Sequence, residues 1–275
     1  SVLFTPFRLG TVELPNRIVV SPMCQYSAVD GVATDWHRIH LGQFALSRAG
    51  LVFVEATAVE PEGRITPGCL GLYSDDCERA LKEVVAMFRA QAGTTRIVIQ
   101  LGHAGRKASS RRPWEGGGGL PRQEGGWQTV APSGVAFDDG RDPPQELDRA
   151  GLDRIRAAFA RAAERAVHIG FDVIELHMAH GYLMHQFLSP LSNKRRDEYG
   201  GTLENRLRFP LEVFDAVRAV VPASTPLGLR VSATDWIDGG WTPEDTIVLA
   251  QEIERRGASF IDVSMGGIST KAQIP

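Results

Sequence analysis

The segment from Ile174 to Gly201, IELHMAHGYLMHQFLSPLSNKRRDEYGG, concentrates side chains that can do chemistry. His177 ends an apolar, strand-like stretch, and His180 and Tyr182 follow shortly after it. Two imidazoles and a phenol therefore gather where a strand passes into a turn. In α/β proteins, ligands bind at the carboxyl ends of parallel strands. We therefore expect His177, His180 and Tyr182 to line a site.

The two histidines are open to two interpretations. Imidazoles bind zinc, but zinc sites usually have three or four ligands, and no HExxH motif occurs in the chain. We favour two hydrogen-bond donors that point at one electron-rich oxygen and polarise it, as an oxyanion site does. Tyr182 then acts as a proton donor near that oxygen. A metal-dependent hydrolase that uses His177, His180 and His103 is the alternative function.

Further candidate residues follow the other predicted strands. Free cysteines are usually small buried apolar residues, but Cys24 comes just after a strand, where its thiol can donate weakly to a cofactor. Arg230 interrupts the apolar run PLGLRVSA, and a buried arginine is costly unless it meets an anion. Arg230 therefore predicts an ion pair with a carboxylate such as Glu175, or contact with an electron-rich ring. The other candidates at strand ends are the small Ala56, which leaves room for a flat ligand, Gln100 and Tyr26.

Apolar runs alternate with amphipathic segments along most of the chain, which predicts an α/β fold. The apolar runs are continuous rather than alternating, which is typical of parallel strands covered on both faces. A short hairpin around Gly10 and Thr11 precedes them. We expect strands at 17–21, 51–59, 96–101, 171–176, 226–231 and 258–265, and helices at 36–48, 74–92, 147–169, 203–220 and 242–256.

The candidate residues end several successive strands, which favours a TIM (β/α)8 barrel over a doubly wound sheet with one switch point. No GxGxxG motif follows the first strand, which further weakens a Rossmann-type interpretation. A barrel needs eight strands and only six are predicted, so we expect strands seven and eight to be absent from this chain. We expect a single domain over residues 1–275. The Gly- and Pro-rich loop at 105–145 predicts a flap over the active site, since loops this long are usually functional.

The composition excludes several classes of protein. The chain has 275 residues, a formal net charge of −3 and 43% hydrophobic residues, which indicates a large core and no nucleic-acid or membrane-surface partner. No run approaches the roughly 20 apolar residues of a membrane span, and the amino-terminal residues do not resemble a secretory signal. Three cysteines without a CxxC motif indicate a reducing cytoplasm. We expect structural roles for Cys69, Cys77, His103 and His168.

Six motifs occur together and in order, and this set resembles the old yellow enzyme family of flavin-dependent ene-reductases. The variant with Cys24 and the compact length are similar to the thermophilic-like bacterial branch of that family. The resemblance runs from about Leu3 to Pro275, and its most specific part is the last motif. The motifs are SPMCQY at 21–26, EATAV at 55–59, EGRITPG at 62–68, HAGRK at 103–107, HMAHGYL at 177–183 and SNKRRDEYGGTLENR at 192–206.

The resemblance implies a TIM barrel that holds FMN non-covalently and takes electrons from NADPH or NADH. Activated alkenes, such as enones, enals, maleimides and nitroalkenes, then accept a hydride from flavin N5 at the β-carbon and a proton at the α-carbon. The resemblance also implies a homo-oligomer, a dimer or tetramer. A 2,4-dienoyl-CoA-reductase-like enzyme is less favoured because a cysteine cluster for iron and sulfur is missing. A non-catalytic flavin-binding barrel is a further alternative.

The resemblance also assigns roles to individual residues. It implies that His177 and His180 bind the carbonyl or nitro oxygen of the substrate and that Tyr182 donates the proton. It implies that Tyr26 contacts the substrate and that the Cys24 thiol tunes the flavin. The residues implied to contact the flavin are Ser21, Pro22, Met23, Cys24, Ala56, Gln100 and Arg230.

Overall fold

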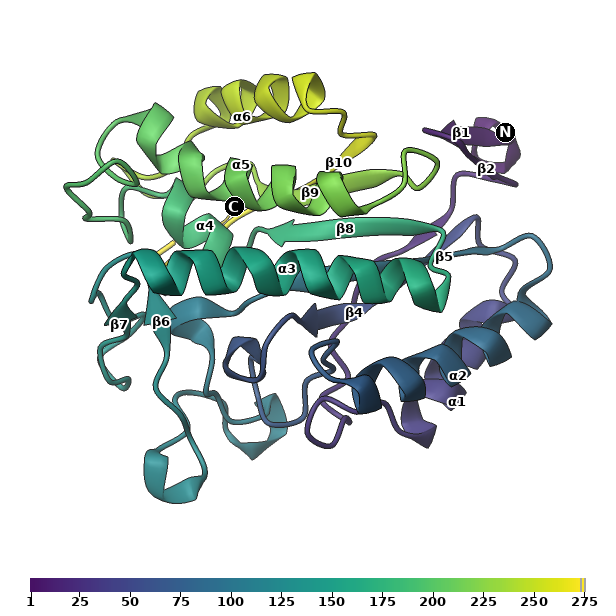
Figure 1. Cartoon of the computed structure of the whole chain (residues 1–275), viewed down its shortest axis with the longest axis horizontal. Coiled ribbons are helices and arrows are strands. Elements are labelled where there is room, and N and C mark those ends of the chain that lie inside the picture. Colours follow the sequence, from purple (N-terminus) through teal and green to yellow (C-terminus); the bar gives the residue numbers. More distant parts are fainter. Residues whose placement is uncertain (273, 275) are drawn as a thin grey trace.

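The computed structural model of the chain describes residues 1–272 and 274, so the predicted domain limit at Pro275 lies outside the described residues. Its centre is a six-stranded, entirely parallel sheet in the order β10-β9-β8-β5-β4-β3 (Figure 1). Strands next to one another in the sheet are also successive along the chain. The strands are β3 (Val19–Val20), β4 (Leu51–Ala58), β5 (Arg96–Gly102), β8 (Val173–Met178), β9 (Leu227–Ser232) and β10 (Phe260–Ser264).

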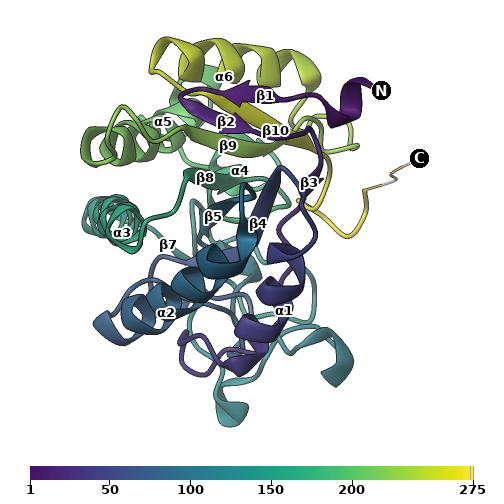
Figure 2. The same cartoon turned by 90° about the vertical axis from the view of Figure 1, so that its right-hand side faces the viewer.

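Helices connect the strands and cover the outer face of the curved sheet (Figure 2). This β–α–β alternation is the repeating unit of a TIM barrel. The helices are α1 (Asp35–Ala45), α2 (Asp75–Ala92), α3 (Arg149–Ile169), α4 (Leu183–Leu188), α5 (Leu203–Val220) and α6 (Pro243–Arg255). Two small sheets join β1 (Phe7–Leu9) to β2 (Val12–Leu14) and β6 (Val130–Ala131) to β7 (Gln145–Glu146).

The ends of the long helices follow from local sequence signals. Ser74 accepts a hydrogen bond from the amide of Cys77 at the start of α2, and Asp148 accepts one from Gly151 at the start of α3. Gly170 ends α3 in the left-handed conformation that a helix end favours. Thr242 caps α6, whose first residue is Pro243. These capping residues therefore set where the long helices begin and end.

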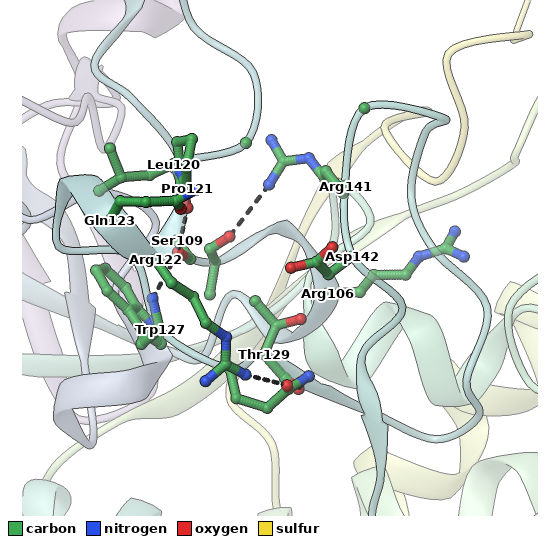
Figure 3. A pocket seen from close by; sticks show the side chains of 14 residues that line it. Arg106, Ser109, Leu120, Pro121, Arg122, Gln123, Trp127, Thr129, Arg141 and Asp142 are labelled. Carbon is green, nitrogen blue, oxygen red and sulfur yellow. Dashed lines mark hydrogen bonds between the residues drawn. The ribbon is translucent and has the colours of Figure 1, made fainter.

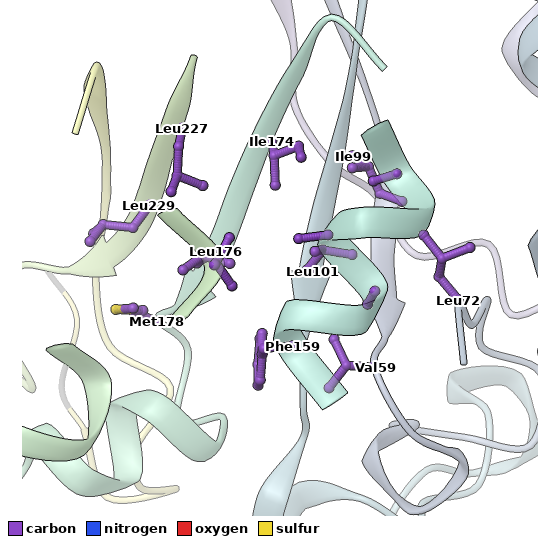
Figure 4. Packing of buried hydrophobic residues seen from close by; sticks show 14 of the residues in the cluster. Val59, Leu72, Ile99, Leu101, Phe159, Ile174, Leu176, Met178, Leu227 and Leu229 are labelled. Carbon is purple, nitrogen blue, oxygen red and sulfur yellow. The ribbon is translucent and has the colours of Figure 1, made fainter. Parts of the chain in front are cut away.

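Most of the core lies between the sheet and its helices (Figure 4). Side chains from successive strands, such as Ile99, Ile174 and Leu227, point outward and pack under α3 and its neighbours. A second, smaller cluster fills the concave inner side of the sheet and includes Phe53, Val98 and Val173. Leu14 of the amino-terminal hairpin packs into this inner cluster, which places the hairpin against the amino ends of the strands.

The predicted strands and the described ones agree except at a few places. The strand expected at 17–21 is only β3, because Asn16 bonds back to the amide of Ile18 and the chain leaves the sheet at Ser21. The short helix α4 was not expected, because its residues directly continue the HMAHGYL motif. The predicted amino-terminal hairpin is confirmed.

The sheet does not close on itself within the described residues. Strands β3 and β10 have free edges, and an apolar groove lies between them, lined by Phe7, Leu14, Phe53, Phe260 and neighbouring residues. The fold is therefore a six-stranded part of a TIM barrel, as the strand count predicts.

Candidate active site

The carboxyl end of β8 brings three ring side chains together. The ring of His177 lies 5.1 Å from that of His180 and 4.8 Å from that of Tyr182, edge to face in both pairs. The rings of His180 and Tyr182 are 6.5 Å apart. His177 is the penultimate residue of β8, His180 lies in the following turn, and Tyr182 is the N-cap of α4. One turn therefore positions all three predicted catalytic side chains.

Burial keeps these rings in their neutral forms. It lowers the pKa of His177 well below its usual value, and the positive charges that His180 and Arg230 can carry add to this effect. Burial also lowers the pKa of His180 to about 4. Burial raises the pKa of Tyr182 well above its ordinary value, and the nearby Cys24 adds to the increase. Near pH 7 the site thus holds two neutral imidazoles and a protonated phenol.

The turn that carries His180 is strained and tightly held. His180 has a φ of 57°, a left-handed conformation that is uncommon for residues other than glycine. Its amide donates to Ser232 Oγ at 2.9 Å, and its carbonyl accepts from Lys107 Nζ at 2.8 Å. Its ring nitrogen Nε2 lies 2.6 Å from Ser264 Oγ. Side chains from β9, β10 and the loop after β5 thus determine where this imidazole lies.

A small pocket opens beside His177 and Tyr182, and it is also lined by Ala56, Ile65 and Cys69. Cys69, which we expected to be purely structural, therefore also borders the site, although its sulfur accepts from the amide of Thr66 at 3.3 Å. Small side chains at the end of β4 leave this space beside the rings open.

Cys24 and Tyr26 lie in the loop that follows β3, near Tyr182. Their charges would raise the pKa of Tyr182, which indicates that the three groups are neighbours. The loop is tied to β4, because the amide of Gln25 donates to Glu55 Oε2 at 3.1 Å. Burial raises the pKa of Cys24 well above its usual value, so its sulfur stays a thiol. The structure therefore brings Cys24 and Tyr26 to the same site as the rings.

Gln100 and Arg230 lie on strands next to these residues but make contacts within the sheet. Gln100 Nε2 donates to Glu175 Oε2 at 3.0 Å, and burial raises the pKa of Glu175 to about 8. Arg230 Nε lies 3.3 Å from Asp262 Oδ2, without the alignment of a hydrogen bond. The ion pair expected between Arg230 and Glu175 is therefore replaced by one with Asp262, its register partner on β10.

The segment at 21–23 lies partly outside the pocket described above. Ser21 lines the groove between the free edges of β3 and β10, and Met23 is 46% exposed. Pro22 is half-buried between them. Within the described residues, these three do not line the pocket that His177 and Tyr182 share.

His103 does not join His177 and His180 in a set of metal ligands. Its Nδ1 accepts from the amide of Gly105, and its Nε2 lies 3.0 Å from Glu60 Oε1, which also pairs with Arg154. No group of three or more metal-binding side chains occurs in the part of the chain that the structure describes. This arrangement removes the observation on which a metal-dependent hydrolase would depend. The structural roles expected for His103, His168 and Cys77 agree with a contact between each histidine and a glutamate and with burial of the thiol.

The loop at 105–145 is folded on itself and lines an open pocket of about 340 Å³ (Figure 3). Leu120, Pro121 and Trp127 lie on one side of this pocket, with Arg141 and Asp142 on the other. Arg141 is engaged with the carbonyl of Ala108, the hydroxyl of Ser110 and the carboxylate of Asp138. The loop is therefore an ordered unit held by hydrogen bonds among its own residues.

Four residues of the site escaped the sequence analysis: Lys107, Ser232, Ser264 and His185. Lys107 was visible only as part of the HAGRK motif, and both serines are common residues at strand ends. His185 follows Gly181 by one helical turn, but nothing in its spacing distinguishes it from a core residue of α4. Only the folded chain brings these side chains to the turn at His180.

Comparison with known proteins agrees with this geometry. Residues 2–274 match the NADH:flavin oxidoreductase / NADH oxidase family. An NADH:flavin oxidoreductase of Gibberella zeae is 46% identical over 99% of this chain and 69% of its own length. An NADPH dehydrogenase of Geobacillus thermodenitrificans is 42% identical over 98% of this chain and 74% of its own length.

Solved structures show the same fold. Morphinone reductase in complex with tetrahydroNAD superposes with a TM-score of 0.81 at 33% identity, covering 96% of this chain and 73% of that chain. Old yellow enzyme from a Pichia species superposes with a TM-score of 0.83 at 29% identity, covering 96% of this chain and 71% of that chain. The helices among the described residues include none that is long and apolar enough to cross a membrane. The chain thus belongs to the old yellow enzyme group of the NADH:flavin oxidoreductase family.

Proposed function

We propose that this NAD(P)H:flavin oxidoreductase is an FMN-dependent ene-reductase that reduces activated alkenes, such as enones, enals, maleimides and nitroalkenes. The observation that carries the proposal is the set of three rings at the end of β8: two neutral imidazoles and one protonated phenol within 6.5 Å of one another. Neutral imidazoles donate hydrogen bonds without adding a full charge, which suits a ligand oxygen that gains negative charge only during the reaction.

The histidines polarise the acceptor. Nδ1 of His177 accepts from the amide of Ala179, so its hydrogen is on Nε2 and is available to a ligand oxygen. If Ser264 donates to Nε2 of His180, the hydrogen of that ring is on Nδ1 and is available in the same way. Two such donors draw electron density onto a carbonyl or nitro oxygen, and the β-carbon of the alkene becomes electrophilic. When bound, the flavin supplies the hydride that this carbon accepts.

Tyr182 supplies the proton. Its raised pKa keeps the phenol protonated over the whole physiological range, so it can give a proton to the α-carbon as the negative charge develops there. Tyr26 lies near enough to Tyr182 to influence its pKa, and we assign it to the substrate side of the site.

The described residues fit a flat, electron-rich cofactor. Arg230 is the register partner of His177, and its Nε is buried without a hydrogen-bond partner among the described residues. Ala56 and Gln100 are register partners on β4 and β5 and add a small side chain and an amide at the same level. We assign these three residues, with Ser21, Pro22, Met23 and Cys24, to FMN. A cation beside the ring system stabilises a reduced, anionic flavin.

We further propose that the loop at 105–145 acts as a flap over this site and that the protein works as a homo-oligomer in a reducing, cytoplasmic compartment. The flap is supported by Lys107, which belongs to this loop and contacts the carbonyl of His180. The compartment is supported by three free cysteines, Cys24, Cys69 and Cys77.

A visible spectrum tests the cofactor, and turnover tests the reaction. We expect the purified protein to be yellow, to lose its colour anaerobically with NADPH, and to regain it when cyclohexenone or a maleimide is added. A protein that binds no flavin on reconstitution contradicts the cofactor assignment. A flavoprotein that NADPH bleaches but no activated alkene reoxidises is an oxidoreductase of another kind, and it contradicts the ene-reductase proposal.

A further inference from the structure

The peptide that joins His180 to Gly181 is held at both of its polar atoms by side chains. Lys107 Nζ donates to its carbonyl oxygen at 2.8 Å, and its N–H donates to His185 Nδ1 at 2.8 Å. Both flanking residues are left-handed, with φ of 57° for His180 and 73° for Gly181. A non-glycine residue keeps such a conformation only where its surroundings impose it. The place of the His180 ring therefore depends on these two contacts.

The contact with His185 is possible in one tautomer only. Because Nδ1 accepts the hydrogen bond from Gly181, the ring hydrogen must be on Nε2. Nε2 lies 2.8 Å from Asp235 Oδ1, a close contact between two buried groups without the alignment of a hydrogen bond. The second oxygen of this carboxylate accepts from Ser189 Oγ at 2.6 Å and from the amide of Trp241 at 2.8 Å. Asp235 is therefore oriented by two donors, and its carboxylate lies next to Nε2 of His185, where its negative charge favours a hydrogen on that nitrogen.

The pair of His185 and Asp235 is completely buried and lies outside the pocket. A buried carboxylate is costly, and an apolar pair of similar volume often stabilises a core as well or better. Stability alone therefore does not explain the pair. It connects α4 to the loop between β9 and α6, directly behind the turn that carries His180.

We propose that His185, set in its tautomer by Asp235, is a positioning residue that keeps the imidazole of His180 where the ene-reductase reaction needs it. The catalytic part of this proposal rests on the proposed function, whereas the tautomer and the hydrogen bond do not. Without an acceptor at His185, the buried N–H of Gly181 is unsatisfied and the left-handed turn is no longer imposed. The ring of His180 then leaves its place beside His177 and Ser264.

Three variants separate the contribution of the His185 acceptor from that of Asp235. In Asp235→Asn, the single carboxamide oxygen remains with Ser189 and Trp241, so the amide group faces His185 and drives its hydrogen onto Nδ1, against the N–H of Gly181. His185→Leu removes the acceptor and leaves an apolar side chain of similar size. His185→Asn restores an acceptor near the place of Nδ1 and serves as the conservative variant.

The first experiment is nitrogen-15 NMR of the histidine side chains in the complete chain, with the signal of His185 identified by its loss in His185→Asn. We expect an unprotonated Nδ1 and a protonated Nε2 in the native protein, and the reverse in Asp235→Asn. A native ring protonated on Nδ1, or a tautomer that Asp235→Asn leaves unchanged, overturns the proposal whether or not the protein reduces alkenes.

The second experiment measures steady-state kinetics with cyclohexenone on the flavin-loaded proteins, matched for flavin content. We expect His185→Leu and Asp235→Asn to lower kcat/KM for the alkene by about 10- to 100-fold, mainly through KM, and His185→Asn to recover most of it. Equal kinetics in all four proteins overturns the positioning role. If His185→Leu does not fold, the kinetics of Asp235→Asn and His185→Asn alone test the positioning role. A native protein with no alkene turnover contradicts the proposed function instead, and the NMR result then stands by itself.

Discussion

Gln100 Nε2 lies 3.0 Å from Glu175 Oε2, and these register partners occupy adjacent strands in the interior of the sheet. The carboxyl of Glu175 is fully buried. Burial is the main cause that raises its pKa to about 8, while the hydrogen bond from Gln100 acts in the opposite direction. Glu175 is therefore mostly protonated at pH 7 in the folded protein, with an ordinary carboxyl pKa in the unfolded chain.

The first prediction concerns this proton. Because the folded state binds it more tightly, the stability that it contributes is complete below about pH 4.5 and is lost as pH rises through about 8. In Glu175→Gln, the side chain keeps the shape of the protonated carboxyl group and stays neutral at every pH. As the pH rises from 7 to 9, we expect the free energy of unfolding of the variant to increase by about 1 kcal/mol relative to that of the native protein. Thermal unfolding at both pH values measures this gain, with the exposed Glu164→Gln as control. Parallel pH dependence in native and variant proteins contradicts it.

The second prediction concerns the paired imidazoles. His177→Ala combined with His180→Ala removes both donors to the ligand oxygen but leaves the flavin contacts assigned above. We expect alkene reduction to fall by at least about 10²-fold, since one such donor is typically worth that much. Flavin content and slow NADPH oxidation by oxygen should persist. His168→Ala, at an exposed histidine paired with Glu78, is the matched control. Survival of enone reduction in the double variant would falsify the role of the pair.

The third prediction concerns the proton donor. Tyr182→Phe keeps the ring that packs against His177 and removes only the hydroxyl group. We expect reoxidation of the reduced flavin by an enone to slow by about 10²- to 10⁴-fold, the usual range for general acid catalysis, while reduction by NADPH changes little. Stopped-flow measurement of the two half-reactions separates these effects. Tyr73→Phe, which loses a hydrogen bond to the carbonyl of Asp30, is the control. If both half-reactions slow equally, Tyr182 is not the proton donor.

The fourth prediction concerns the ion pair behind the loop after β5. Burial raises the pKa of Glu60, but the hydrogen bonds and charges of His103 and Arg154 outweigh it and lower the pKa to about 2. The stability that this carboxylate contributes is therefore present above about pH 4.5 and lost as pH falls through about 2. We expect Glu60→Gln to lower the free energy of unfolding by about 3 kcal/mol at pH 7 and by progressively less below pH 4.5. Urea unfolding at pH 7 and pH 3 measures the difference, and the exposed Glu62→Gln is the control. An equal cost at both pH values would contradict a stabilising role for the charge of Glu60.

Much of the architecture could be predicted, because the signals for it are local. The continuous apolar runs at 51–58 and 96–102 and the caps at Ser74, Asp148 and Thr242 specify strands and helices without reference to the rest of the chain. The strand before Ser21 was predicted too long, since edge pairing and the bond from Ile18 to Asn16 are not visible in a pattern of apolar residues.

The candidate site also has a part that local sequence predicts and a part that depends on the folded chain. The sequence alone determined that His177, His180 and Tyr182 share one turn, because their spacing of a few residues at a strand end permits little else. Only the tertiary structure decided which groups hold that turn and which protonation states it has. Lys107, His185, Ser232 and Ser264 lie far apart along the chain, and burial, which sets the pKa of each ring, is a property of the packed molecule rather than of any segment.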